Sequence, residues 1–229
     1  MQLKAVLTAR VLGFVELATL NPQGRIFFPS IVSGIVGRFN FQKYPTAPEQ
    51  FDESKGIEFH DGQWDGINVS NLTIYNNGFL IDTQASTSVS EQVLMTSLEW
   101  AKEAFGITFS PEMIYRRRYL SDLLVSTDVP ILDGFKPINN LRQNLSNAMD
   151  AILAERLQYA GIRLDVDFER FQRQAAIAPL TIQRRLDHAF SDNHYFSEAP
   201  LPTEAHFDLL EQYEKDIIST LGSAAADQQ

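Results

Sequence analysis

Residues 67–83 read INVSNLTIYNNGFLIDT, and this stretch decides what kind of fold the chain forms. Residues 67–75 fit a strand, and Asn76, Asn77 and Gly78 follow it directly. Asn and Gly tolerate the positive φ that a type I′ turn demands, so this triplet is the strongest turn signal in the chain. Residues 79–83 are again mostly apolar and predict a second strand that pairs back on the first.

A helix is predicted to follow this hairpin. Ser88 and Glu91 have the Ser-x-x-Glu spacing of a capping box, in which each side chain satisfies a backbone N–H group at the helix start. Gly106 stands where a left-handed residue commonly ends a helix. Between these signals, apolar side chains recur at helical spacing on one face: Val93, Leu94, Leu98, Ala101 and Phe105.

The rest of the chain continues this mixture of strands and helices. Further strands are predicted at 3–19, 25–28, 39–44, 57–60, 113–126, 162–171 and 180–186. Further helices are predicted from Ser30 to Phe39, within 47–53, within 138–158 and from Thr203 onward. Turns are predicted at 21–24 and at Asp61-Gly62, and residues 191–202 are predicted to be irregular. No internal sequence repeat is visible.

Hairpins that alternate with helices predict an α+β fold with a mainly antiparallel sheet and three longer helices packed on it. Two prolines and a glycine within residues 128–137 suggest a boundary there. We therefore expect an N-terminal α+β region at 1–130, a C-terminal helix–hairpin–helix region at 131–221 and a flexible tail at 222–229. A single domain formed by both regions is the alternative.

Composition narrows the classes of function. The 229 residues include no Cys, which excludes disulfides, thiolate metal sites and Cys nucleophiles. The formal net charge of −10 disfavours nucleic acid as a partner, although local basic patches remain compatible with it. No stretch reaches the roughly 18 apolar residues of a membrane helix, so we expect a cytoplasmic protein without a membrane partner.

Three carboxylates lie two residues apart at Asp165, Asp167 and Glu169, within RLDVDFERF at 163–171. In a strand they would share one face, and hard divalent cations bind such oxygen ligands. A metal-dependent hydrolase or nuclease could use them, with His188 or His194 assisting. However, Ile162, Leu164, Val166 and Phe168 form an apolar reverse face, and strict alternation is typical of any half-buried strand. We favour this simpler interpretation, with the carboxylates facing arginines of the next strand.

The other polar features allow similar alternatives. Asp187 and His188, with His194 six residues later, could form an acid–base pair or belong to an ordinary connector. We expect His60 to be a turn residue and His206 to lie neutral at a surface or interface.

Arg116, Arg117 and Arg118 are the densest basic run, and Arg116 and Arg118 would share one side of a strand. They could bind an anionic small ligand, whereas Arg117 with Tyr115 and Tyr119 is typical of internal pairing or an interface.

Catalytic motifs are absent, His is sparse and charge is unevenly distributed. We therefore rank first a non-catalytic interaction or assembly subunit of a larger protein complex, with other protein subunits or a second copy of itself as partner. The metal-dependent hydrolase is the alternative, and an anion binder at Arg116 and Arg118 is the second alternative. No catalytic, metal or cofactor-binding residue is assigned, and no cofactor is expected.

Overall fold

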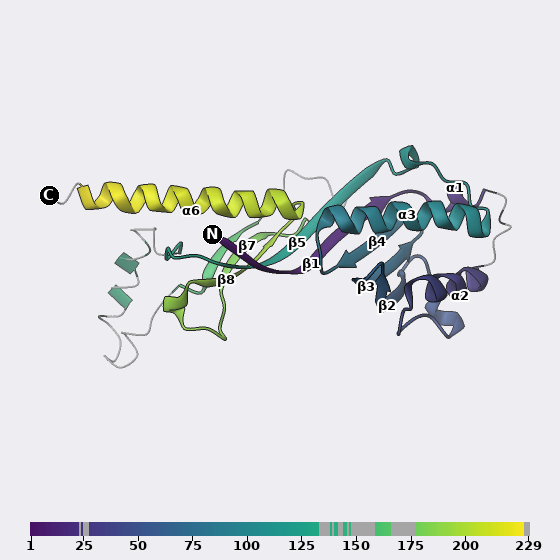
Figure 1. The fold of residues 1–229 in the computed structure, drawn as a ribbon, viewed down its shortest axis with the longest axis horizontal. Coiled ribbons are helices and arrows are strands. Elements are labelled where there is room, and N and C mark those ends of the chain that lie inside the picture. The colour runs from purple at the N-terminus through teal and green to yellow at the C-terminus, as the bar shows by residue number, and fades with distance from the viewer. Residues whose placement is uncertain are drawn as a thin grey trace. The chain divides into compact units, whose positions relative to one another are not determined.

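The computed structural model describes residues 1–22, 24, 28–132, 138, 140, 141, 144, 145, 147, 159–165 and 177–226. Within them the fold is α+β, with one antiparallel sheet and three long helices, which confirms the predicted class (Figure 1). The strands are β1 (Gln2–Phe14), β2 (Ile57–Trp64), β3 (Ile67–Tyr75), β4 (Gly78–Thr83), β5 (Arg116–Ser126), β6 (Gly161–Leu164), β7 (Leu180–Arg184) and β8 (His194–Ala199). Their order in the sheet is β2-β3-β4-β1-β5-β8-β7-β6.

The helices that accompany these strands are α1 (Leu17–Leu20), α2 (Phe28–Phe39), α3 (Thr87–Phe105) and α6 (Thr203–Ala226). Short 3₁₀ helices lie at Pro48–Gln50, Pro111–Met113 and Phe190–Asp192. Residues 138, 140, 141, 144, 145 and 147 are helical, in agreement with the start of the predicted helix at 138–158, and the remainder of that range lies outside the described residues.

The predicted hairpin at 67–83 is present. Tyr75 pairs with Gly78, so Asn76 and Asn77 form a two-residue loop between β3 and β4. Neither asparagine has a positive φ, so the turn is not type I′. The preceding hairpin closes at Asp65-Gly66, whose φ angles are 48° and 76°, and not at Asp61-Gly62 as predicted. Instead, β2 continues through Gly62, where a Cβ atom would lie 2.5 Å from the ring of Phe41.

Helix α3 forms as predicted, but the predicted cap is wrong: the helix begins at Thr87, so Ser88 lies inside it. Ser86 is the N-cap, and its hydroxyl accepts a hydrogen bond from the Val89 N–H group. Gly106 ends the helix with φ 71°, and its N–H group donates to the Lys102 carbonyl. Val93, Leu94 and Leu98 are buried against the sheet, as their spacing predicts.

Several predictions near the N-terminus are wrong at their boundaries. Strand β1 ends at Phe14, and α1 replaces the rest of the predicted strand. Helix α2 begins at Phe28, so Ser30 lies inside it, and residues 25–27 of the strand predicted at 25–28 lie outside the described residues. Within α2, Gly34 permits close packing on α3, because a Cβ atom there would lie 2.4 Å from the Phe105 ring.

Further differences concern single segments. Residues 39–44 do not form a strand. Only an isolated bridge joins Lys43 to His60, and Phe41 is buried in the core. Residues 191–202, predicted to be irregular, contain β8. The predicted strand at 162–171 is β6, which ends at Leu164, and residues 166–171 lie outside the described part of the chain.

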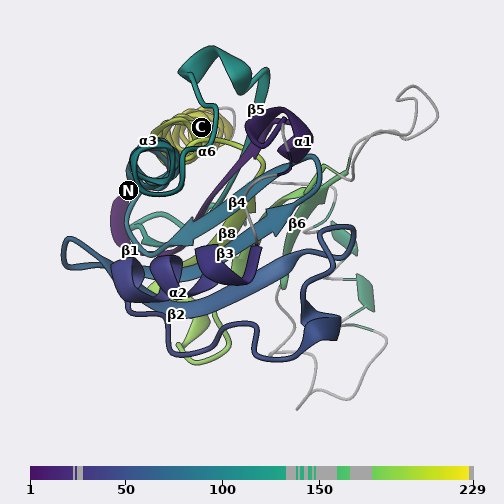
Figure 2. The same ribbon diagram turned by 90° about the vertical axis from the view of Figure 1, so that its right-hand side faces the viewer.

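The contacts between residues divide the chain into two compact units. The first unit comprises Val6–Ser121 with Pro200–Thr203, and its core joins α2 and α3 to strands β1 to β4. Figure 2 shows α2 running along β2 in this unit. The second unit comprises Met1–Ala5, Asp122–Ala199 and Glu204–Gln229, and its core includes Leu123, Val125, Tyr195 and Leu210. The division predicted near 128–137 stays a prediction.

The same order of elements occurs twice along the chain. After the short helix α1, strand β1 is followed by α2, by β2, β3 and β4 and by α3. Strand β5 is followed by the helical residues near 140, by β6, β7 and β8 and by α6. The strand orders β2-β3-β4-β1 and β6-β7-β8-β5 are therefore equivalent. Strands β4 and β8 both have 6 residues, and each is joined by three residues, 84–86 and 200–202, to a helix that begins with Thr. The topology repeats although the sequence shows no repeat.

Candidate functional site

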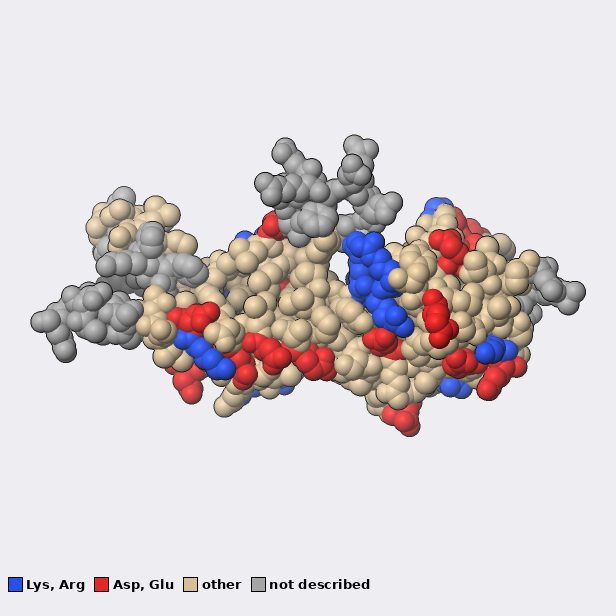
Figure 3. Space-filling model, turned by 90° about the horizontal axis from the view of Figure 1, so that it is seen from above, with Lys and Arg blue, Asp and Glu red and all other residues tan. Residues whose placement is uncertain are grey.

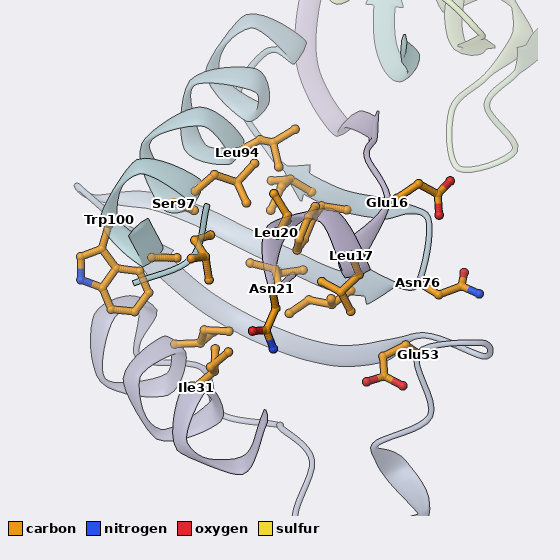
Figure 4. Close-up of a pocket in the computed structure, with 18 of the residues that line it drawn as sticks. Glu16, Leu17, Leu20, Asn21, Ile31, Glu53, Asn76, Leu94, Ser97 and Trp100 are labelled. Carbon is orange, nitrogen blue, oxygen red and sulfur yellow. The ribbon is translucent and has the colours of Figure 1, made fainter. Parts of the chain in front are cut away.

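A cavity of about 470 Å³ lies in the first unit, between the sheet and its helices (Figure 4). Helices α1, α2 and α3 enclose it together with one face of β3 and β4. Its lining is predominantly apolar: Leu17, Ala18, Leu20, Ile31, Ile35, Phe39, Leu72, Ile74, Phe79, Ile81, Leu94, Leu98, Trp100, Ala101 and Ile107. Ligand pockets in proteins commonly have volumes of roughly 300–1,000 Å³ and linings of this kind.

The floor of the cavity follows from the hairpin that decides the fold. Because side chains alternate along a strand, Leu72 and Ile74 of β3 point to the same face. The register places Leu72 opposite Ile81 and Ile74 opposite Phe79. All four side chains are buried, so the two cross-strand pairs form a continuous apolar surface under the helices.

The walls come from helical positions that share one face. Helix α3 contributes Leu94, Ser97, Leu98 and Ala101, which follow the i, i+3, i+4, i+7 spacing. Ser97 and Ala101 are small, and the Ser97 hydroxyl donates to the Val93 carbonyl of its own helix. Space therefore remains between α3 and the sheet at this level.

Trp100 lies at one end of the cavity in Figure 4. Its ring meets Phe105 edge-on, with 5.2 Å between centroids and an interplanar angle of 83°. The Arg38 guanidinium carbon lies 4.9 Å from the Trp100 ring centroid, a cation–π contact between the last turn of α2 and α3. These contacts hold the indole at the boundary of the cavity.

Polar groups gather at the opposite end. Figure 4 shows Glu16, Asn76 and Glu53 there, away from Trp100, with the side chains of Glu16 and Asn76 directed away from the cavity. Asn21 also lines the cavity. The backbone ties these segments together: the Leu17 N–H group donates to the Asn76 carbonyl at 2.8 Å, and the Asn76 N–H group donates to the Glu53 carbonyl at 3.0 Å. Among the described lining residues none is Lys or Arg, so this end of the cavity is acidic.

The predicted carboxylate cluster is only partly described. Asp165 accepts hydrogen bonds from Arg163 of its own segment, with 2.7 Å from Nε to Oδ2 and 3.0 Å from Nη2 to Oδ1. The bond from Arg163 lowers the pKa of this exposed carboxyl group. Arg163 thus replaces the arginines of the next strand as the partner that we expected for Asp165. Asp167 and Glu169 lie outside the described residues, so the metal-dependent hydrolase stays a prediction.

The structure brings His188 and His194 together. Their rings stack with 4.2 Å between centroids and 13° between planes. The distance from Asp187 Oδ2 to His188 Nε2 is 3.8 Å. Asp187 also accepts hydrogen bonds from Arg185, and these lower the pKa of the Asp187 carboxyl group. Within the described part of the chain no three His, Asp or Glu side chains are grouped closely enough to hold a metal ion.

The other two histidines differ from expectation. His206 is fully buried in α6, and its Nε2 atom lies 2.8 Å from the Ser197 hydroxyl of β8, so it belongs to the core of the second unit and not to a surface. His60 lies within β2 beside Glu58, with 3.1 Å between Nε2 and Oε2, and not in a turn.

The arginine run lies at the start of β5. Arg116 is exposed, and its guanidinium carbon is 6.0 Å from the Phe14 ring centroid. Arg117 forms an ion pair with Glu91 of α3 at 2.7 Å, and Tyr119 donates to the same carboxylate at 2.9 Å. Internal pairing of Arg117 and Tyr119 was one of the interpretations that the sequence allowed. Anion binding at Arg116 and Arg118 stays a prediction.

On the face drawn in Figure 3, acidic side chains are spread widely and basic side chains gather mainly in one group. None of the described helices is both long enough and apolar enough to cross a membrane.

No protein-family model, curated protein or solved structure matches this chain. Sequence reasoning placed Leu94, Leu98 and Ala101 on one helix face but did not find the cavity. The available signal was the pair of small residues, Ser97 and Ala101, on the side of α3 that faces the sheet.

Proposed function

We propose that this chain is a non-catalytic binding protein that holds a small apolar molecule in the cavity of its first unit. The cavity itself carries the proposal: about 470 Å³ of space with a mostly apolar lining. Protein interiors are otherwise closely packed, so a hollow of this size among apolar side chains is unusual. A bound apolar molecule would supply the missing contacts.

The repeated topology offers an internal comparison. Counting from Thr87 and Thr203, Ser97 and Ala101 of α3 correspond to Tyr213 and Ile217 of α6. Tyr213 is half-buried and donates a hydrogen bond to the Ile131 carbonyl at 2.9 Å, and Ile217 is buried. Large side chains thus stand on α6 where α3 has small ones. This contrast supports the view that the space beside α3 serves binding and is not a requirement of the topology.

Binding is tested with N-phenyl-1-naphthylamine, a small neutral probe whose fluorescence rises in apolar surroundings. We expect saturable binding to the full chain. Replacing Trp64 by Phe leaves Trp100 as the only indole, because the chain has 2 Trp, and energy transfer from Trp100 to the probe then reports proximity to the cavity.

The variant Ala101→Ile should narrow the cavity and weaken this binding. The matched control is Ala104→Ile, the same substitution on the exposed side of α3. Equal loss of binding in both variants, or binding unaffected by Ala101→Ile, would overturn the proposal.

A second candidate function remains the interaction subunit that we ranked first from sequence. The observation that favours it is the end of α6, which extends past β7 and β8 in Figure 1 and exposes Ile218 and Leu221. Partly exposed apolar side chains in neighbouring turns are typical of helices that pack on another protein. Sedimentation of the wild-type chain and of Ile218→Asp would test self-association: a dimer that the substitution dissociates supports it, and a monomer in both cases excludes the homodimer.

A further inference from the structure

We propose that Trp100 determines which ligands the cavity accepts. Its indole separates the apolar space from the Arg38 guanidinium group, so the cavity binds an uncharged compound such as a long-chain alcohol and discriminates against the corresponding carboxylate. This inference rests on the proposed function and adds the chemical class of the ligand and the residue that selects it.

The indole of Trp100 lies between the cavity and a cation. Trp100 lines the cavity, and Figure 4 shows its ring at one end, with the nitrogen on the side away from the other labelled residues. The Arg38 guanidinium carbon lies 4.9 Å from the centroid of this ring, yet Arg38 does not line the cavity. The exposed cation at the end of α2 is therefore close to the cavity but is screened from a ligand by the indole.

Neighbouring groups hold the indole in this position. The Phe105 ring meets it edge-on at 5.2 Å between centroids, and Phe105 itself packs against Gly34 of α2, where no space remains for a Cβ atom. Arg38 contacts the indole from α2, so Trp100 is held by residues of both helices. Trp100 is thus part of a packed group between α2 and α3, and its side chain forms a wall of the cavity.

The remaining lining offers no partner for a carboxylate. Among the lining residues that the structure describes none is Lys or Arg, and Ile31 and Ile35 stand near Trp100 on the side of α2. The charged residues of the lining, Glu16 and Glu53, have the same sign as a carboxylate. A carboxylate that enters the cavity would lose water and gain no compensating charge, which is costly, whereas an alcohol carries no charge to desolvate.

The test compares decanol with decanoate, which share one chain length and differ in head group, by displacement of N-phenyl-1-naphthylamine at submicellar concentrations and neutral pH. We expect the wild-type chain to bind decanol at least about tenfold more tightly than decanoate, because only the carboxylate has a charge to desolvate.

The variant Trp100→Ala should remove the wall between the ligand and Arg38. The guanidinium group then faces the vacated space and can donate charge-assisted hydrogen bonds to a carboxylate, so we expect the affinity for decanoate relative to decanol to rise at least about tenfold. Raising the salt concentration should reduce this gain. Trp100→Leu, which keeps an apolar side chain of smaller size, should change the ratio in the same direction and provides a second variant if Trp100→Ala does not fold.

Two controls assign the change to the contact between Trp100 and Arg38. The double variant Trp100→Ala/Arg38→Gln should return to the wild-type preference, because the cation that would bind the carboxylate is gone. Trp64→Ala makes the same substitution at a partly buried tryptophan of the first unit that does not line the cavity, and it should retain the wild-type preference. Circular dichroism and urea unfolding establish which variants are folded.

The outcomes separate this inference from the proposed function. Decanoate binding to the wild type as tightly as decanol overturns the ligand class. An unchanged ratio in the folded Trp100 variants, or a gain that persists without Arg38, overturns the role of Trp100. Each of these results leaves the apolar cavity standing. Failure of the probe and of both amphiphiles to bind overturns the proposed function and this inference together.

Discussion

Thr87 and Thr203 are joined by two reciprocal hydrogen bonds. The Thr87 N–H group donates to the Thr203 hydroxyl oxygen at 3.0 Å, and the Thr203 N–H group donates to the Thr87 hydroxyl oxygen at 2.9 Å. Each residue is the first of its helix, and both are buried. The first N–H groups of a helix have no hydrogen-bond acceptor within that helix. Each threonine hydroxyl therefore accepts a hydrogen bond from the first N–H group of the other helix. This exchange is possible because the repeated topology places the same residue type at equivalent positions.

Thr87→Val should therefore destabilise the protein although it preserves the shape of the side chain. It leaves the buried Thr203 N–H group without its acceptor, which costs about 1–3 kcal/mol of unfolding free energy. Urea denaturation of the variant measures the loss. Thr87→Ser keeps the hydroxyl group and should lose clearly less unfolding free energy than Thr87→Val. If Thr87→Val proves as stable as Thr87→Ser, the reciprocal hydrogen bonds do not stabilise the protein in this way.

The elements that could be predicted from sequence are those with local signals. The loop at Asn76 and Asn77 and the helix that ends at Gly106 were both found because turn residues and helical spacing act over a few residues. Asp61-Gly62 carries the same local signal as Asp65-Gly66, yet only the latter forms a turn. The choice depends on packing, since Gly62 lies against the ring of Phe41, and such a contact is not visible in the sequence.

Strand β8 was not predicted, for a related reason. Its inward-facing residues are Tyr195, Ser197 and Ala199, so the alternation of apolar and polar residues is masked. Ser197 is tolerated in the core because its hydroxyl lies 2.8 Å from His206 Nε2 and donates to the Thr181 carbonyl. Ser97 and Ala101 are only a weak sequence signal for the cavity, because small residues suit any helix. Only the pairing of α3 with the sheet shows that they leave space.

Arg10→Met should be strongly destabilising. Arg10 of β1 and Asp82 of β4 are register partners, and the guanidinium group binds the carboxylate through both Nε and Nη2 at 2.7 Å. Asp82 is buried, so removing its partner leaves an unpaired charge in the protein. We expect a loss of about 2–4 kcal/mol in the free energy of unfolding, below the largest values for buried pairs because the Arg10 side chain is partly exposed.

An exposed pair of the same geometry serves as the control for Arg10. Arg163 also binds Asp165 through Nε and Nη2, but both side chains are exposed. Arg163→Met should leave the urea midpoint unchanged within error, since surface ion pairs contribute little. Asp82→Asn in the Arg10→Met background should recover part of the loss. Equal effects of the two arginine substitutions would contradict the role assigned to burial.

Ala101→Ile should raise the stability of the ligand-free protein. The added methyl and methylene groups extend into the cavity beside α3 and form contacts with its apolar lining. Cavity-filling substitutions commonly contribute ~0.5–2 kcal/mol. Thermal unfolding of Ala101→Ile and Ala104→Ile compares the same change in helix propensity at a cavity position and at an exposed one. A lower midpoint for Ala101→Ile than for Ala104→Ile would mean that the space cannot accept the side chain.

Alkaline pH should weaken the second unit through Tyr213. Burial, followed by the nearby charge of Tyr195, raises the pKa of the Tyr213 phenol from 10.0 to about 12. The folded state therefore keeps a proton that the unfolded chain loses above pH 10. The stability that this group contributes is fully present below pH 10 and is lost as the pH rises through about 12.

The measurement for Tyr213 is the difference in unfolding free energy between the wild type and Tyr213→Phe at several pH values from 8 to 12. The phenylalanine variant lacks both the titrating group and the bond to the Ile131 carbonyl, so it should be less stable at pH 8. The difference should shrink steadily above pH 10, and the tyrosinate absorbance lost in the variant should titrate near 12. A difference that stays constant over this range would show that Tyr213 ionises equally in both states.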